Sequence, residues 1–266
     1  MSKALRLSVE ANPFAAGAAH SAYAEWRGGR LVHPLAPGRG PSPLAALVHG
    51  RFRAHVLGPG FSCVGARAAV NGDTYRFGLY GEMGSPGATA GLAHDLFEYE
   101  RERPGFGTNF ATYVACFAGP PVRDEAEWER LLWSQLQALH DLDRGSHAWD
   151  ASVSSDPEDP RFSFSFAGTA FFVVGLHPAS SRLARRFAWP ALAFNAHEQF
   201  ERLRERGQFE RVRAAVRARE RELQGSLNPN LSDYGERSEA RQYSGRAVEG
   251  EWRCPFSARG GGGPED

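Results

Sequence analysis

Two apolar segments around residue 170 dominate the pattern of hydrophobic and polar positions along the chain. Phe162, Phe164 and Phe166 alternate with serines, which predicts a half-buried strand. After the Gly168-Thr169 break, residues 170–176 form an almost continuous apolar run, which predicts a central strand. We therefore expect a hairpin whose second strand ends in a polar cluster, an arrangement typical of functional sites.

The polar cluster after this hairpin is rich in hydroxyl and guanidinium groups. His177 comes first, and Ser180, Ser181 and Arg182 follow, with Arg185 and Arg186 a few residues later. Guanidinium groups can hold a carboxylate or phosphate through paired hydrogen bonds. A surface turn with solvated arginines explains the same residues, and the pattern alone leaves both interpretations open.

The rest of the chain predicts alternating strands and helices. Acidic residues open the clearest helix, Asp124 to Asp143, which carries apolar residues along one face. Hydrophobic periodicity further predicts strands over Thr74–Tyr80, Asn109–Phe117 and Ala191–Asn195, and helices over Thr89–Arg101, His197–Arg206 and Phe209–Leu223. The last two helices alternate Arg and Glu, which indicates solvated faces.

These elements predict one α+β domain, built on a single mixed or antiparallel sheet with flanking helices. We expect an extended N-terminal arm over residues 1–45, the folded domain over residues 46–256, and a disordered tail over residues 257–266, where Gly and charged residues dominate. The Arg- and Glu-rich helical face would tolerate self-association into a homo-oligomer.

Composition excludes several classes of protein. The 266-residue chain is 42% hydrophobic and has a formal net charge of zero, so it has a sizeable core and no global field for nucleic acid. It has neither an apolar run long enough to span a membrane nor a secretory signal pattern, and we expect a cytoplasmic protein. Lys3 is the only lysine and is expected in a mobile tail, which excludes phosphate-loop and Schiff-base lysine chemistry.

Motifs for common enzyme classes are also missing. The three cysteines, Cys63, Cys116 and Cys254, lack the spacing of zinc or redox sites. No zinc-protease helix, serine elbow or dinucleotide fingerprint is present.

A succession of short motifs resembles the YqcI/YcgG family. The resemblance covers about residues 50 to 256 and runs in order through Phe61-Ser62-Cys63, Thr74-Tyr75-Arg76-Phe77-Gly78, Leu139-His140-Asp141-Leu142-Asp143, Trp149-Asp150, Phe164-Ser165-Phe166, His177-Pro178, Phe194-Asn195, Asn228-Pro229, Asp233-Tyr234-Gly235 and Glu239-Ala240-Arg241-Gln242-Tyr243. The branch that looks most similar contains haem-dependent N-hydroxylases of guanidino compounds, including the arginine hydroxylase of D-cycloserine formation and the pre-guanitoxin hydroxylase.

The resemblance implies a haem-dependent monooxygenase that N-hydroxylates L-arginine or a related guanidino or amino compound in natural-product biosynthesis, such as antibiotic biosynthesis. Haem b, O2 and an external electron donor, and hence a redox partner protein, are implied with it. A non-catalytic haem or small-molecule binding protein is the alternative. A mononuclear non-haem iron enzyme is disfavoured because no close His-x-Asp or His-x-Glu pair is present.

Within this resemblance, Cys63 fits the family motif and is the preferred axial ligand, because a thiolate donates electron density toward the O–O bond. His177 and His197 remain alternative ligands. Arg182, Arg185 and Arg186 are candidates for binding haem propionates or a substrate carboxylate. Glu239 is the candidate acceptor for the substrate guanidinium, and Arg241 is a second basic candidate.

Overall fold

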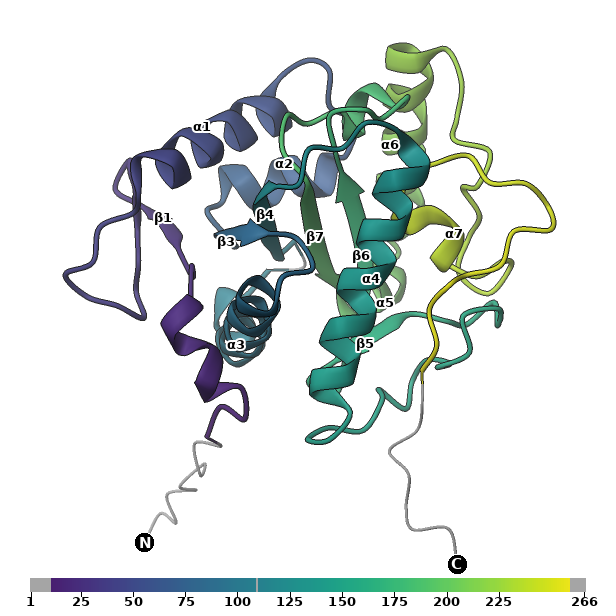
Figure 1. Ribbon diagram of the computed structural model, residues 1–266. Helices are drawn as coiled ribbons and strands as arrows, with labels where there is room; N and C mark the ends of the chain where they lie inside the picture. The colour runs from purple at the N-terminus through teal and green to yellow at the C-terminus, as the bar shows by residue number, and fades with distance from the viewer. Residues whose placement is uncertain (1–10, 109, 259–266) are drawn as a thin grey trace, which may run out of the picture.

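A five-stranded mixed sheet forms the centre of the computed structural model, which describes residues 11–108 and 110–258 (Figure 1). The strand order is β3-β4-β7-β6-β5; β3 pairs with β4 in parallel and the other neighbours are antiparallel. The strands are β3 (Tyr75–Glu82), β4 (Thr112–Gly119), β5 (Phe164–Phe166), β6 (Thr169–Leu176) and β7 (Ala191–Ala196). The predicted α+β fold with one mixed sheet is confirmed, and a small two-stranded sheet accompanies it.

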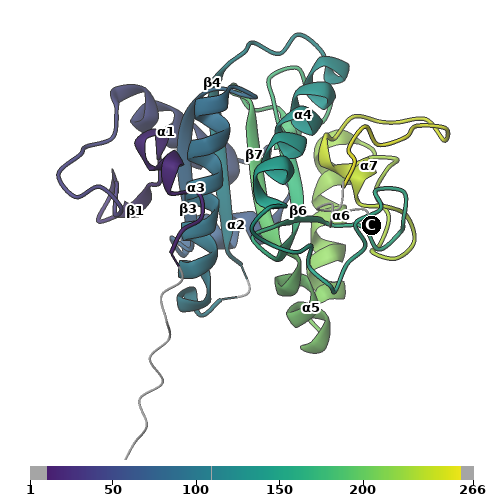
Figure 2. The same ribbon diagram turned by 60° about the horizontal axis from the view of Figure 1, so that its bottom comes forward.

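Helices cover both faces of the sheet (Figures 1 and 2). One face carries α3 (Pro86–Glu102) and α4 (Glu125–Asp143), and the other carries α1 (Pro43–Leu57) and α2 (Val64–Asn71). Three further helices follow β7: α5 (His197–Glu205), α6 (Phe209–Gln224) and the short α7 (Ala240–Tyr243), while the 3₁₀ turns are η1 (Ala15–His20), η2 (Arg103–Phe106) and η3 (Leu183–Arg185). The predicted helices α3 to α6 are confirmed, with ends that differ by a few residues.

Alternation along the strands divides the core into two layers. On β4, Tyr113, Ala115 and Phe117 pack with the α3 and α4 side, whereas Val114 and Cys116 pack with the α1 and α2 side. Because both faces of the sheet are covered, its inner strands are buried throughout, as in other three-layer domains.

The predicted hairpin forms, with Phe164 opposite Phe171. The expectation that its first strand would be half-buried is wrong, because Ser163 and Ser165 are buried as well. Ser165 Oγ accepts a hydrogen bond from Asp150 N–H at 3.0 Å, and the Tyr243 hydroxyl accepts one from Phe164 N–H at 3.0 Å. The loop before the strand and the C-terminal segment thus cover the face that alternation assigned to solvent.

The N-terminal segment packs against α3 and the sheet edge. It contains η1 and a hairpin of β1 (Glu25–Arg27) and β2 (Arg30–Val32). Ala22 N–H donates to the fully buried Asp95 at 2.7 Å, and Ala24 bridges to Phe77 on β3. A Cβ at Gly91 would lie 2.3 Å from the carbonyl oxygen of His20, so this close approach requires glycine.

Some predictions fall outside the described residues. They concern Lys3, Asn109 and the predicted tail from residue 259 onward. Over the ranges that the structure covers, no helix has the length and apolar character needed to cross a membrane.

Gly175 on β6 allows α4 to pack closely on the sheet. A Cβ added there would lie 2.7 Å from the Trp128 ring and 2.9 Å from a Leu132 methyl group. Trp128 and Leu132 are themselves fully buried, so neither has room to move aside.

We therefore predict that Gly175→Ala lowers the free energy of unfolding by roughly 1–3 kcal/mol through overpacking. Gly50→Ala is the matched control, because Gly50 lies exposed within α1 with nothing near its absent Cβ. That control should stabilise the protein by up to about 1 kcal/mol through helix propensity. Urea denaturation measures both changes, and equal unfolding free energies for wild type and Gly175→Ala would contradict the packing described.

Candidate functional site

A cavity of about 270 Å³ lies between the sheet and the helices α2, α5 and α6. It is largely apolar, with polar groups at its ends. Its lining side chains include Cys63, Ala66 and Ala69 of the α2 region, Phe110, Phe172 and Val174 from the sheet region, His197, Phe200, Leu203 and Arg204 of α5, Phe209, Val212, Arg213, Val216 and Arg217 of α6, and Asp233, Tyr234 and Glu239 from the C-terminal segment. Three of the predicted site residues, Cys63, His197 and Glu239, therefore meet in one space.

Cys63 is placed at the amino end of α2 as its N-cap residue. Ala66 N–H donates to Cys63 Sγ at 3.4 Å, a contact that favours a sulfur carrying negative charge. Burial raises the pKa of the Cys63 thiol, while the Ala66 and Gly65 amides and the charge of Arg185 act in the opposite direction. The thiol therefore remains protonated unless a cation binds to the sulfur.

Arg185 is a buried guanidinium close enough to influence Cys63. It donates to the Tyr243 carbonyl oxygen at 2.9 Å, and burial lowers its pKa to about 10. Within the described residues it forms no ion pair shorter than 4.0 Å. A negative charge at Cys63 would be stabilised by this uncompensated positive charge.

Glu239 and His197 are two buried polar residues in the lining of the cavity. Glu239 Oε1 lies 3.9 Å from His197 Nδ1, while His197 Nε2 lies 3.2 Å from Glu201. Only 6% of Glu239 and 5% of His197 is exposed, yet Glu239 Oε2 and His197 Nδ1 lack a partner in hydrogen-bonding geometry. Buried polar atoms are normally satisfied, so these two are available to a bound molecule.

Burial sets the charge states of these two groups. It raises the pKa of Glu239 to about 8, against the opposing influence of Ser163 and Arg204. It lowers the pKa of His197, which Glu201 partly counteracts. At neutral pH both side chains are therefore mainly uncharged, and Glu239 can pair with a cation only by losing its proton.

Three arginines from α5 and α6 line the cavity beside these groups. Arg213 and Arg217 both pair with Asp233, the second at 3.0 Å, and the Arg204 guanidinium lies 4.2 Å from the centre of the Phe209 ring. Sequence reasoning assigned these arginines to solvated helix faces. One sequence pattern could have indicated that this face of α6 lines a cavity. Apolar residues four apart, Val212 and Val216, give the helix a narrow apolar stripe next to Arg213 and Arg217.

The other predicted residues lie outside the cavity lining. His177 is fully buried and stacks on Trp128, with ring centroids 5.0 Å apart. Burial lowers its pKa to about 4. Arg182 pairs with Glu220 of α6 at 2.7 Å, and Arg186 donates to the Ser180 carbonyl oxygen at 2.8 Å.

Arg241 is likewise engaged with its own chain. Its guanidinium donates to the carbonyl oxygens of Glu249, Gly250 and Trp252, at 3.0, 3.1 and 2.8 Å. These bonds fasten the C-terminal loop beside α7. Among the residues that the structure describes, no group of three or more His, Cys, Asp and Glu side chains is arranged to hold a metal ion.

The elevated pKa of Glu239 predicts a pH-dependent stability. Because its pKa is about 8 in the folded chain and 4.5 ordinarily, its contribution is complete below pH 4.5 and is lost between these values. We expect the unfolding free energy to fall with a slope of up to about 1.4 kcal/mol per pH unit from this group. Glu239→Gln should flatten that slope in denaturation series between pH 5 and 8.

The groups that face Glu239 are His197, Arg204, Glu201 and the Ser163 and Tyr243 hydroxyls, and all are retained in this variant. Glu236→Gln, at an exposed position in the same segment, is the control and should keep the wild-type slope. Parallel pH profiles for wild type and Glu239→Gln would show that the carboxyl is not held neutral.

Comparison with known proteins places the chain among sequence relatives of undefined activity. The YqcI/YcgG family pattern matches residues 52–257. The chain is 29% identical over 209 residues to the uncharacterized protein YcgG of Bacillus subtilis (strain 168), covering 74% of this chain and 81% of that protein. It is 28% identical over 206 residues to the uncharacterized protein YqcI of the same organism, covering 74% and 80%. No solved structure matches the chain. The match over most of the folded domain shows that the chain belongs to the YqcI/YcgG family.

Proposed function

We propose that the protein is a haem-dependent monooxygenase that N-hydroxylates the guanidino group of L-arginine or a related compound. The observation that carries the proposal is the shared cavity, in which Cys63 and the buried carboxyl of Glu239, with its free Oε2, line the same apolar space. A soft axial donor and a carboxylate acceptor are the two groups that such a reaction needs from the chain.

The cavity has the donor groups that a haem requires. Its walls are apolar, Cys63 offers a single axial ligand with an amide hydrogen bond to its sulfur, and Arg204, Arg213 and Arg217 offer positive charge for propionates. When bound, the haem would supply oxygen activation, with the chain setting its axial ligand and its surroundings.

The size of the cavity adds a condition. At about 270 Å³ it lies just below the ~300–1,000 Å³ typical of small-molecule sites, and a porphyrin needs more room. We infer that α6 moves outward to admit the macrocycle. Only Glu220 is buried on this helix, and the movement would separate Glu220 from Arg182 and would separate Arg213 and Arg217 from Asp233.

Glu239 would bind and orient the substrate. A guanidinium presents paired N–H donors, and a carboxylate presents paired acceptors, so the two form a bidentate pair. Binding requires Glu239 to release its proton, and the positive charge of the bound guanidinium favours that release. The apolar walls exclude water and strengthen this pair.

The overall reaction is balanced with an external donor. One oxygen atom of O2 enters an N–H bond of the guanidino group and the other leaves as water, which consumes two electrons and two protons. A redox partner protein would deliver the electrons. The competing function, non-catalytic haem binding, uses the same cavity and differs only in the absence of turnover.

We predict that the purified protein, supplied with haem, shows a Soret band with thiolate ligation. Cys63→Ala should abolish or shift this band more than His177→Ala does, because Cys63 lines the cavity and His177 stacks on Trp128. Cys254→Ala is the matched control, since this half-buried cysteine lies outside the cavity lining. A larger change in His177→Ala, or colourless protein that remains active, would overturn the ligand assignment.

For the reaction, we predict that L-arginine, O2 and a reductant yield a product that is heavier by one oxygen atom, detected by mass spectrometry. Glu239→Gln should weaken arginine binding by roughly tenfold or more, because a charge-assisted pair is replaced by neutral hydrogen bonds. Glu236→Gln should bind arginine as the wild type does. Tight arginine binding without any oxidised product would favour the binding protein, and equal affinities in both variants would remove Glu239 from the site.

A further inference from the structure

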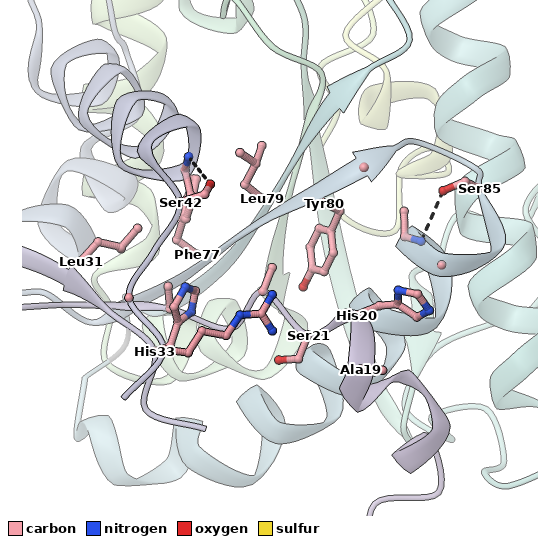
Figure 3. Close-up of a pocket in the computed structure, with 18 residues that line it drawn as sticks. Ala19, His20, Ser21, Leu31, His33, Ser42, Phe77, Leu79, Tyr80 and Ser85 are labelled. Atoms are coloured by element: carbon pink, nitrogen blue, oxygen red, sulfur yellow. Dashed lines mark hydrogen bonds between the residues drawn. The ribbon is translucent and has the colours of Figure 1, made fainter. Parts of the chain in front are cut away.

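A second, larger cavity of about 500 Å³ lies at the opposite edge of the sheet (Figure 3). It is enclosed by the N-terminal segment, the end of β3 and the starts of α1 and α3. One wall is apolar, with Leu31, Phe77 and Leu79, and the other carries polar side chains. The family match begins at residue 52, so most of the polar wall belongs to the segment before it.

The arginine and histidine side chains of this cavity face no acidic side chain in its lining. Arg39, His20 and His33 line it, and no aspartate or glutamate does. The chain as a whole has 31 acidic and 31 basic residues, so a wall without a carboxylate is a local departure from its composition. A cavity lined in this way favours an anion.

The basic groups are free to bind. Arg39 is exposed, and its guanidinium makes no hydrogen bond or ion pair within residues 11–108 and 110–258. His33 Nδ1 lies 2.9 Å from the Tyr23 carbonyl oxygen. Because a carbonyl oxygen only accepts, Nδ1 carries a proton, and Nε2 donates to a bound anion when it takes up a second proton. Ser21 and His33 lie beside the same space in Figure 3.

Two helices begin at this cavity, and their amino ends add to its preference for an anion, which the basic side chains establish. Ser42 caps α1 and Ser85 caps α3, and both serines line the cavity. The amino ends of helices carry partial positive charge, so both act in the same direction as Arg39.

We propose that this cavity binds a small organic phosphate monoester. A phosphate dianion presents three oxygens and two negative charges, which match the separate donors from Arg39, the histidines and Ser21, whereas a carboxylate presents two oxygens and one charge. The cavity is larger than inorganic phosphate needs, and its apolar wall offers a surface for the organic part. This site is independent of the haem proposal.

The test is isothermal titration calorimetry of the full chain with four probes: phenyl phosphate, inorganic phosphate, benzoate and phenol. We expect phenyl phosphate to bind at least roughly tenfold more tightly than inorganic phosphate or benzoate, and phenol to show no binding. Absence of phenyl phosphate binding, or equal affinity for benzoate, would overturn the proposal.

Variants locate the binding. Arg39→Ala and His33→Gln should each weaken phenyl phosphate binding by roughly tenfold, because each removes a charge-assisted contact. Arg30→Ala is the charge-matched control: Arg30 is exposed on the nearby strand β2 but does not line the cavity. An equal loss in Arg30→Ala, or unchanged binding in Arg39→Ala, would place the ligand elsewhere and overturn the proposal.

Discussion

Glu239 is buried at the end of an apolar cavity without a cationic partner, and the desolvation of its carboxyl governs what this site can do. Burial raises the pKa of Glu239 to about 8, and it keeps the neighbouring His197 neutral. Burying this carboxyl lowers the free energy of unfolding, because buried unpaired polar groups are destabilising. A residue with a purely structural role would avoid this loss of stability. A cationic ligand would relieve that cost, which is the physical basis of the guanidinium site that we propose.

At Cys63 the group that must be stabilised is a negatively charged thiolate. The amino end of α2 and the buried Arg185 both favour a charged sulfur, but burial of the thiol outweighs them while no cation is bound. A metal bound to the sulfur would reverse this balance. The site thus combines a carboxyl and a thiol whose pKa values are both raised by burial, and the helix α6 beside them has one buried residue.

Much of the fold could be predicted from the sequence, because strong periodicity marked its elements. The Phe-rich hairpin and α4 have unambiguous patterns, and Asp124 does cap α4 by accepting the Glu127 amide at 2.7 Å. The burial of Ser163 could not be predicted, because it depends on distant segments that cover β5. The helix α1 also gave no clear pattern, since exposed Leu44 and Leu47 blur its apolar face.

Part of the candidate site could also be predicted, because some of its residues lie in recognisable motifs. Cys63 and Glu239 came from family-like motifs and His197 from its place just after Asn195, and all three line the same cavity. The arginines after the hairpin do not line this cavity: Arg182 pairs with Glu220 and Arg185 bonds to the Tyr243 carbonyl oxygen. Local sequence cannot reveal such partners, which come from residues about 40 to 60 positions away.

A crystal structure of the haem-loaded protein with L-arginine would test the central claim most directly. The account predicts iron bonded to Cys63 Sγ, the substrate guanidinium paired with the Glu239 carboxylate, and α6 displaced from the position it has here. Haem bound at another face of the sheet, or arginine bound away from Glu239, would contradict it.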